Sequence, residues 1–143
     1  MTLYAYTDGA SRGNPGESGI GAVVKTAGGS TILKFQRHIG KATNNIAEYT
    51  ALLELLECMR EIACTRLVVH SDSELMVRQL NGSYRVKEPE LRRRYERIVA
   101  LREELPFSIE IRHVTREQNR EADRLANEGI DGTSGRWQAA VEV

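Results

Sequence analysis

Short apolar runs bounded by turn residues dominate the first forty positions of the chain. Runs at 4–6, 20–25 and 31–39 are separated by a loop rich in glycine and by an Ala-Gly-Gly-Ser turn at 27–30. Apolar runs of this length between turn residues are typical of β-strands. Because short loops join them, we expect the three strands to pair as an antiparallel meander.

The pattern then changes to a helical period. Apolar residues recur every three or four positions from Ile46 to Ile62, which predicts a helix with Asn44 or Asn45 as its N-cap. Further strands are expected at 66–72 and 107–114. Further helices are expected at 73–80, 89–105 and about 119–128, with Pro89 in the first turn of the second of these.

The order of elements predicts one α/β domain over residues 1–130. Three strands, a helix, a strand, two helices, a strand and a helix imply a mixed sheet with helices packed on its faces. Residues 131–143 are interpreted as a C-terminal tail, and the sequence leaves open whether its Trp137 and Val141 dock on the domain.

Composition limits the possible classes of protein. A chain of 143 residues with 41% hydrophobic and 28% charged residues is typical of a single globular domain. Its 20 basic and 20 acidic residues balance, so a polyanionic partner would have to be bound by local patches. Cys58 and Cys64 lack zinc-ligand spacing, and no apolar run approaches the roughly 20 residues that cross a bilayer. We therefore expect a cytoplasmic protein without a membrane partner.

Four acidic residues fall at positions that suggest a metal site. Asp8 and Asp72 end two predicted strands, Glu48 lies near the start of the long helix, and Asp123 lies inside the last helix. If the two strands are parallel neighbours, Asp8 and Asp72 emerge at the same sheet edge. Oxygen ligands of this kind suit Mg²⁺ or Mn²⁺. Two such ions about 4 Å apart can activate water and stabilise the leaving oxygen of a phosphodiester.

Each acid also has a structural alternative when it is taken alone. Asp8 is suited to capping the following loop, and Asp72 to capping the helix that begins beside it. Glu48 is suited to the positive end of the helix dipole, and Asp123 to an ion pair with Arg120 or Arg124. The four alternatives are less plausible together than a shared metal site.

Four segments around these acids resemble the type 1 ribonucleases H. They are "YTDGASRGNPG", "TNNIAEYTAL", "VVHSDSELMVRQLNG" and "REQNREADRLAN", in this order and over nearly the whole chain. The resemblance implies a five-stranded mixed sheet, with the first three strands antiparallel, flanked by helices. It implies an endoribonuclease that cleaves the RNA strand of RNA/DNA hybrids with two Mg²⁺ or Mn²⁺ ions and leaves 5′-phosphate and 3′-hydroxyl ends. It also implies that the metal ligands are Asp8, Glu48, Asp72 and Asp123.

Recognition of a hybrid requires groups that sense 2′-hydroxyls on one strand only. Side-chain amides suit this task because a 2′-hydroxyl both donates and accepts hydrogen bonds. By the resemblance, Thr43 and Asn14 form the pocket for a DNA-strand phosphate. The expected substrate-binding residues are Gly9, Asn14, Thr43, Asn44, Asn45 and Ser73.

The chain departs from the family pattern in two loops. The segment "NGSYRVKEPELRRR" is too short for the basic protrusion of many members. Its tyrosine and its cations either replace that protrusion in part or form a solvated helix face: Tyr84, Arg85, Lys87 and Arg92 to Arg94. Glu74 stands where the family often has an amide that contacts a base, so we expect that contact to be lost.

The loop before the last helix is also compressed. The family often has a mobile histidine there, whereas alternation places His113 within the preceding strand. Arg116 lies in the loop itself, and we assign it a catalytic role as a fixed cation near the scissile phosphate. The sequence leaves open which of the two replaces the histidine.

Three other interpretations remain open at this point. The fold could serve a non-catalytic module that binds hybrid or double-stranded RNA, or a DNA resolvase or integrase-like strand transferase. The chain could also be the nuclease part of a longer protein. We expect a monomer with no obligatory protein partner.

Overall fold

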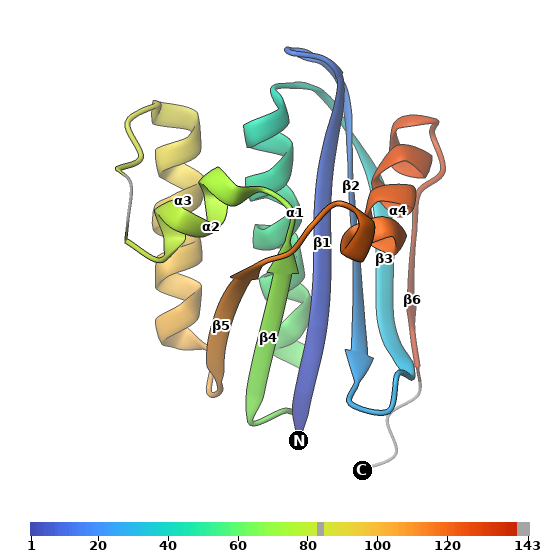
Figure 1. The fold of residues 1–143 in the computed structure, drawn as a ribbon, viewed down its shortest axis with the longest axis vertical. Helices are drawn as coiled ribbons and strands as arrows, with labels where there is room; N and C mark the ends of the chain where they lie inside the picture. The colour runs from blue at the N-terminus through green and yellow to red at the C-terminus, as the bar shows by residue number, and fades with distance from the viewer. Residues whose placement is uncertain (83–84, 140–143) are drawn as a thin grey trace.

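A single six-stranded sheet with helices on both faces forms the described part of the protein (Figure 1). This computed structural model describes residues 1–82 and 85–139. The strand order is β5-β4-β1-β2-β3-β6. The strands are β1 (Thr2–Gly13), β2 (Gly16–Thr26), β3 (Thr31–Ala42), β4 (Arg66–Ser71), β5 (Ser108–His113) and β6 (Gly135–Gln138).

The expected antiparallel meander is confirmed, but the expected count of five strands is wrong. The first three strands are antiparallel neighbours, and β4 pairs in parallel with both β1 and β5. The sixth strand comes from the segment expected to be a tail, where Gly135–Gln138 pairs antiparallel with Leu33–Gln36 of β3. Its four residues are all exposed, so they carry no burial pattern from which a strand is predicted. Trp137 lies in β6 opposite Lys34 and remains 47% exposed, whereas Val141 lies outside the described residues.

The strands are also longer than their apolar runs. β1 continues past Asp8 to Gly13 because β2 pairs with it as far as Gly16, across residues that are mostly polar or small. Hydrogen bonding between strands needs only the backbone, so it continues where side-chain hydrophobicity stops. The β1–β2 hairpin therefore projects beyond the body of the sheet (Figure 1).

Within residues 1–82 and 85–139, four α-helices accompany the sheet. They are α1 (Asn44–Cys58), α2 (Glu74–Leu80), α3 (Pro89–Glu104) and α4 (Arg120–Ile130). The N-cap of α1 is Thr43, whose hydroxyl accepts a hydrogen bond from the Ile46 amide at 3.2 Å. The expectation that Asn44 or Asn45 caps this helix is wrong because both residues already lie inside it. Cys58 ends α1, and a 3₁₀ turn over Met59–Glu61 follows.

The two faces of the sheet are packed differently. The main core joins α1 and α3 to one face, where Ile20 and Ala22 of β2 are buried. Gly21, between them in sequence, faces the other side, and a Cβ atom there would lie 2.6 Å from the backbone nitrogen of Ala126 in α4. Small residues on β2 thus allow α4 to approach the sheet closely, which positions this helix beside the sheet edge.

None of the helices in the described ranges 1–82 and 85–139 has the length and apolar character needed to cross a membrane.

Candidate active site

Parallel pairing of β1 and β4 brings two carboxylates to one edge of the sheet. Thr7 of β1 lies opposite Ser71 of β4, so the next residues, Asp8 and Asp72, emerge side by side. Asp8 is only 4% exposed. The two acids therefore emerge together as the sequence suggested, but the expectation that Asp8 ends its strand is wrong, because β1 continues to Gly13 through its pairing with β2.

Glu48 reaches the same point from the first turns of α1. It is 4% exposed, and its Oε1 accepts a hydrogen bond from the Gly9 amide at 2.6 Å. Gly9 allows this approach because a Cβ atom there would lie 2.1 Å from the backbone carbon of Ala47. Because Gly9 has no side chain, α1 can pack close to β1, and this close packing positions Glu48.

Oxygen atoms of Asp8, Glu48 and Asp72 all lie within 4.8 Å of one another. Asp123, from α4, lines the same cleft and interacts with Asp8. Its Oδ1 accepts a hydrogen bond from Asn127 Nδ2 at 3.3 Å. The fold therefore gathers four carboxylates, from the middle of β1, from the residue after β4 and from two helices.

The structural alternatives for Asp72, Glu48 and Asp123 do not hold. Ser73, not Asp72, caps α2, because its hydroxyl accepts from the Met76 amide. Glu48 is buried and not a solvated residue at the start of a helix. Arg124 pairs with Glu128 at 3.2 Å, and no ion pair within residues 1–82 and 85–139 involves Asp123.

Burial and mutual repulsion make this cluster electrostatically unfavourable. Burial, followed by the charges of Glu48 and Asp72, raises the pKa of Asp8 far above its usual range. Burial and the charge of Asp72 also raise the pKa of Glu48, although the Gly9 amide opposes this shift. Three carboxylate oxygen donors at this spacing fit a hard divalent cation, which would offset both effects.

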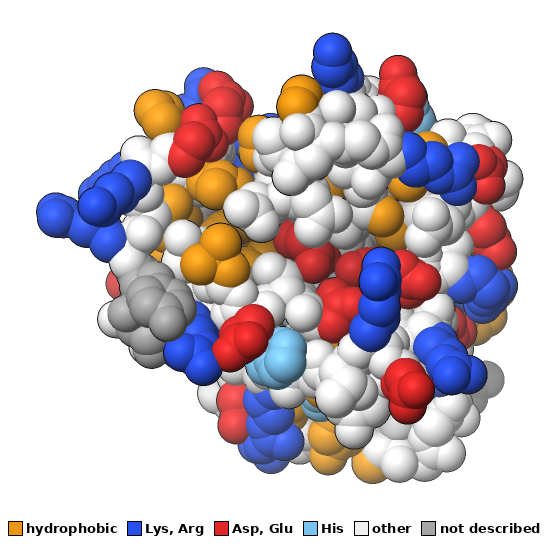
Figure 2. Space-filling model, turned by 45° about the horizontal axis from the view of Figure 1, so that its top comes forward, with side chains coloured by type: hydrophobic (Ala, Val, Ile, Leu, Met, Phe, Trp, Pro, Cys, Tyr) orange, Lys and Arg blue, Asp and Glu red, His pale blue; other side chains and the backbone are white. Residues whose placement is uncertain are grey.

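The acids lie in an open cleft of about 590 Å³. In Figure 2 the acidic side chains gather near the centre of the face, with arginine, lysine and histidine side chains around them. His113, the last residue of β5, and Arg116, in the following loop, are exposed and both line the cleft. Gly9, Asn44 and Ser73 line it as well.

The other expected substrate-binding residues lie beside the cleft. Asn14, at the tip of the β1–β2 hairpin, accepts a hydrogen bond from the Asn44 amide at 3.1 Å. This bond joins the hairpin to the start of α1. Thr43 is engaged as the cap of α1, while Asn45 is exposed on its first turn.

Two supporting asparagines were not foreseen from the sequence. Asn127 lies one helical turn after Asp123, so the i, i+4 spacing was a signal that could have found it. Asn119 is 1% exposed and donates a hydrogen bond to the Thr7 carbonyl at 2.9 Å, which fixes the start of α4 beside Asp8. No sequence pattern marks this contact, because 112 positions separate the two residues.

The arginines of α3 are mostly neutralised by their own helix. Arg92 pairs with Glu96 at 3.0 Å, and both Arg93 and Arg94 pair with Glu90. This arrangement favours the solvated helix face over a free basic surface. Of the other residues expected to act with them, Arg85 and Lys87 make no ion pair among the described residues, whereas Tyr84 lies outside them.

Glu74, in the first turn of α2, pairs with Arg78 at 2.6 Å. Its side chain therefore already has a partner within its own helix.

A mixed sheet with one carboxylate within the first strand, one just after its parallel neighbour and two on flanking helices defines the ribonuclease H-like class of α/β proteins. A family model described as "Reverse transcriptase-like" matches residues 6–129. The crystal structure of RNase H1 from Halobacterium salinarum superposes with a TM-score of 0.86 at 39% identity, covering 93% of this chain and 100% of that one. The structure of LC11-RNase H1 in complex with RNA/DNA hybrid gives 0.87 at 40% identity, covering 91% and 97%.

Curated sequences agree with the structural matches. The "Bifunctional protein Rv2228c" of Mycobacterium tuberculosis is 42% identical over 94% of this chain, and "Ribonuclease HI" of H. salinarum is 40% identical over 90%. The chain spans 37% of the first relative's length and 64% of the second's. The chain belongs to the type 1 ribonuclease H family.

Proposed function

We propose that this protein is an endoribonuclease that hydrolyses the RNA strand of RNA/DNA hybrids, leaving 5′-phosphate and 3′-hydroxyl ends. The observation that carries the proposal is the set of carboxylate oxygens of Asp8, Glu48 and Asp72 within 4.8 Å of one another at an open cleft. The hybrid complex of LC11-RNase H1, which shares 40% identity with this chain, supports the choice of substrate.

The cofactor proposed for this site is a pair of Mg²⁺ or Mn²⁺ ions. Asp8 and Asp72 would be the central ligands, Glu48 would hold an ion on the RNA side, and Asp123 would complete the second position. When bound, such ions supply a water nucleophile and charge stabilisation for the leaving oxygen. The burial of Asp8 and Glu48 supports this assignment, because buried carboxylates without a cation are costly.

The residues around the carboxylates are proposed to orient the hybrid. Asn14, Asn44 and Asn45 would contact the minor groove, with Thr43 and Asn14 near a phosphate of the DNA strand. Gly9 and Ser73 would contact the RNA strand near the carboxylates. The Asn14–Asn44 hydrogen bond supports this role, because it fixes Asn14 relative to the start of α1 before the substrate binds.

Arg116 is proposed as a fixed cation that stabilises negative charge at the scissile phosphate. It is exposed, lines the cleft and makes no ion pair among the described residues. His113 lines the same wall of the cleft from the end of β5. An Arg116→Gln variant that lost activity while His113→Gln kept it would assign the role to the arginine.

The test is hydrolysis of a short labelled RNA/DNA hybrid in Mg²⁺ and in Mn²⁺. Single-stranded RNA and duplex DNA serve as substrate controls, and Asp8→Asn serves as the protein control. Metal-dependent cleavage of RNA in the hybrid alone, lost in the variant, is the expected result. Tight hybrid binding without cleavage in either metal would overturn the enzyme assignment and leave a binding module, and cleavage of duplex DNA would point to a resolvase.

A further inference from the structure

A second concave site lies on the opposite side of the first turns of α1 from the carboxylates. It is a groove of about 460 Å³ between the end of β3, α1 and the start of α3. Asn44 and Glu48 of α1 line the acidic cleft, whereas Ile46 and Thr50 line this groove. The first turns of α1 therefore form a wall between the two sites.

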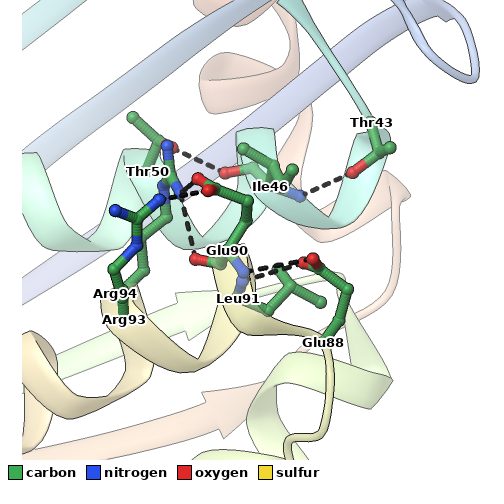
Figure 3. Close-up of polar contacts among 8 residues, drawn as sticks. All are labelled: Thr43, Ile46, Thr50, Glu88, Glu90, Leu91, Arg93 and Arg94. Atoms are coloured by element: carbon green, nitrogen blue, oxygen red, sulfur yellow. Dashed lines mark hydrogen bonds and ion pairs between the residues drawn. The ribbon is translucent and has the colours of Figure 1, made fainter.

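A chain of hydrogen bonds ties the groove to this wall (Figure 3). Arg94 of α3 donates from Nε to the Thr50 hydroxyl at 3.1 Å, and Thr50 donates to the Ile46 carbonyl at 2.6 Å. The Ile46 amide in turn donates to Thr43, the cap of α1. Arg94 is thus fixed against the same helical turn that carries the expected hybrid-reading residues.

The carboxylate of Glu90 lies between two guanidinium groups at the edge of the groove. It pairs with Arg94 at 3.2 Å and with Arg93 (Figure 3). These two arginines lower the pKa of Glu90, so the carboxylate is charged at neutral pH. Lys41, also lining the groove, makes no ion pair within the described part of the chain. The groove is therefore lined by basic side chains and by one carboxylate, that of Glu90.

The spacing of the two sites suits a duplex. An α-helix with its side chains is about 10–12 Å across, so the two sites are separated by roughly that distance. An A-like duplex presents two phosphate backbones on either side of a wide, shallow minor groove. If the RNA backbone lies at the carboxylates, then the backbone of the other strand lies on the far side of α1, next to Glu90.

We propose that Glu90 is an internal competitor for a DNA-strand phosphate: in the free protein its carboxylate occupies the guanidinium groups of Arg93 and Arg94, and the hybrid must displace it. The inference rests on the proposed function, because it takes an RNA/DNA hybrid as the ligand. Glu90 then sets the affinity for the hybrid without contacting the reacting atoms.

The experiment is hybrid binding by Glu90→Gln, measured by fluorescence anisotropy in EDTA over a series of salt concentrations. We expect binding about two- to fivefold tighter than wild type at low salt. The slope of log K against log salt should steepen by about 0.9 for each additional phosphate that the protein neutralises. In Mg²⁺, KM for hybrid cleavage should fall while kcat stays unchanged, because the change affects binding alone.

Glu96→Gln is the matched control, since Glu96 pairs with Arg92 on the same helix and is similarly exposed, at 61% against 47%. An equal increase in affinity for both variants would reflect net charge and would overturn the proposal. The increase should also vanish when Arg93 and Arg94 are both replaced by Gln. If wild type cleaves the hybrid and Glu90→Gln binds it no more tightly, this inference alone fails; if wild type neither binds nor cleaves the hybrid, the proposed function fails.

Discussion

The carboxylates of the cleft and those of the α1–α3 surface are the same chemical groups in opposite electrostatic settings. Asp8 and Glu48 are 4% exposed, and no ion pair joins either to a cation within residues 1–82 and 85–139. The side chains of Glu57 and Glu90 are 40% and 47% exposed, and each pairs with two arginines. The pKa is raised for both cleft acids and lowered for both surface acids, in each case by their surroundings.

This difference separates acids whose charge the protein itself neutralises from acids whose charge it leaves without a cation. An exposed carboxylate beside an arginine is satisfied by the protein itself and contributes little, because water screens the pair. Buried carboxylates that repel one another reduce stability, and such groups persist where a bound cation or a reaction needs them. Two substitutions and two conditions test this contrast, beginning with the largest expected effect.

Asp8→Asn should separate activity from stability. We expect hybrid hydrolysis to fall by more than about a hundredfold, the upper range for loss of groups that merely support metal ligands. Replacement of this buried carboxyl group by an amide should also raise the free energy of unfolding in EDTA at pH 7 by about 0.5–2 kcal/mol, because the folded wild type must hold the group protonated at a pH where the unfolded chain ionises it. Urea unfolding and hydrolysis assays on the same samples measure both effects. A variant that is inactive and also less stable would show that Asp8 is a structural residue.

The stability of the metal-free protein should decline as pH rises. Because the folded-state pKa values of Asp8 and Glu48 lie above their unfolded values, the folded state binds more protons. Their stabilising contribution is complete below the ordinary carboxyl pKa of about 4 and is lost as pH rises through the raised values. Urea unfolding in EDTA should therefore show this contribution falling between about pH 5 and pH 8.

Mg²⁺ should reverse this loss, by about 2.7 kcal/mol at a concentration one hundred times its dissociation constant. The Asp8→Asn variant is the control, and its response to both pH and Mg²⁺ should be smaller. Unfolding curves of the wild type that coincide with and without Mg²⁺ at pH 8 would count against a cation site.

Arg92→Gln should have the smallest effect. Its pair with Glu96 spans 3.0 Å between side chains that are 52% and 61% exposed, so water and salt screen it. We expect the free energy of unfolding to change by less than about 0.5 kcal/mol, and hydrolysis to be unchanged. Urea unfolding at low and high salt measures the difference. A loss above about 1 kcal/mol would mean that the contacts of Arg92, which include a hydrogen bond to the Val86 carbonyl at 3.1 Å, stabilise the fold more than an exposed ion pair does.

The sequence predicted those features that depend on local pattern. The apolar periods located every helix and five of the six strands, because each element buries one face and repeats its apolar positions accordingly. The site acids were found because a carboxylate at the end of a buried strand conflicts with packing. Asp8 and Asp72 end the apolar runs of two such strands, although β1 itself continues to Gly13, and the fold brings the two acids together.

Features that depend on distant contacts were missed. β6 forms because its backbone pairs with β3, about one hundred positions earlier, and its exposed side chains carry no period. Thr43, and not Asn44 or Asn45, caps α1 because its backbone is extended where the helix begins. Thr and Asn are both common N-cap residues, so residue type alone does not decide between the three positions. The hydrogen bond from Asn119 to the Thr7 carbonyl of β1 likewise joins residues that are far apart in the sequence, so no local pattern predicts it.

The placement of β6 also bears on how the protein behaves at high concentration. β6 takes up the hydrogen-bonding groups along Leu33–Gln36, which would otherwise face solvent at the sheet margin. An edge strand with unpaired backbone N–H and C=O groups can pair with other chains, which promotes aggregation. Without β6, a segment that includes the buried Leu33 and Phe35 would become such an edge strand. By pairing with β3, β6 thus protects the sheet against aggregation at the side farthest from β4 and β5.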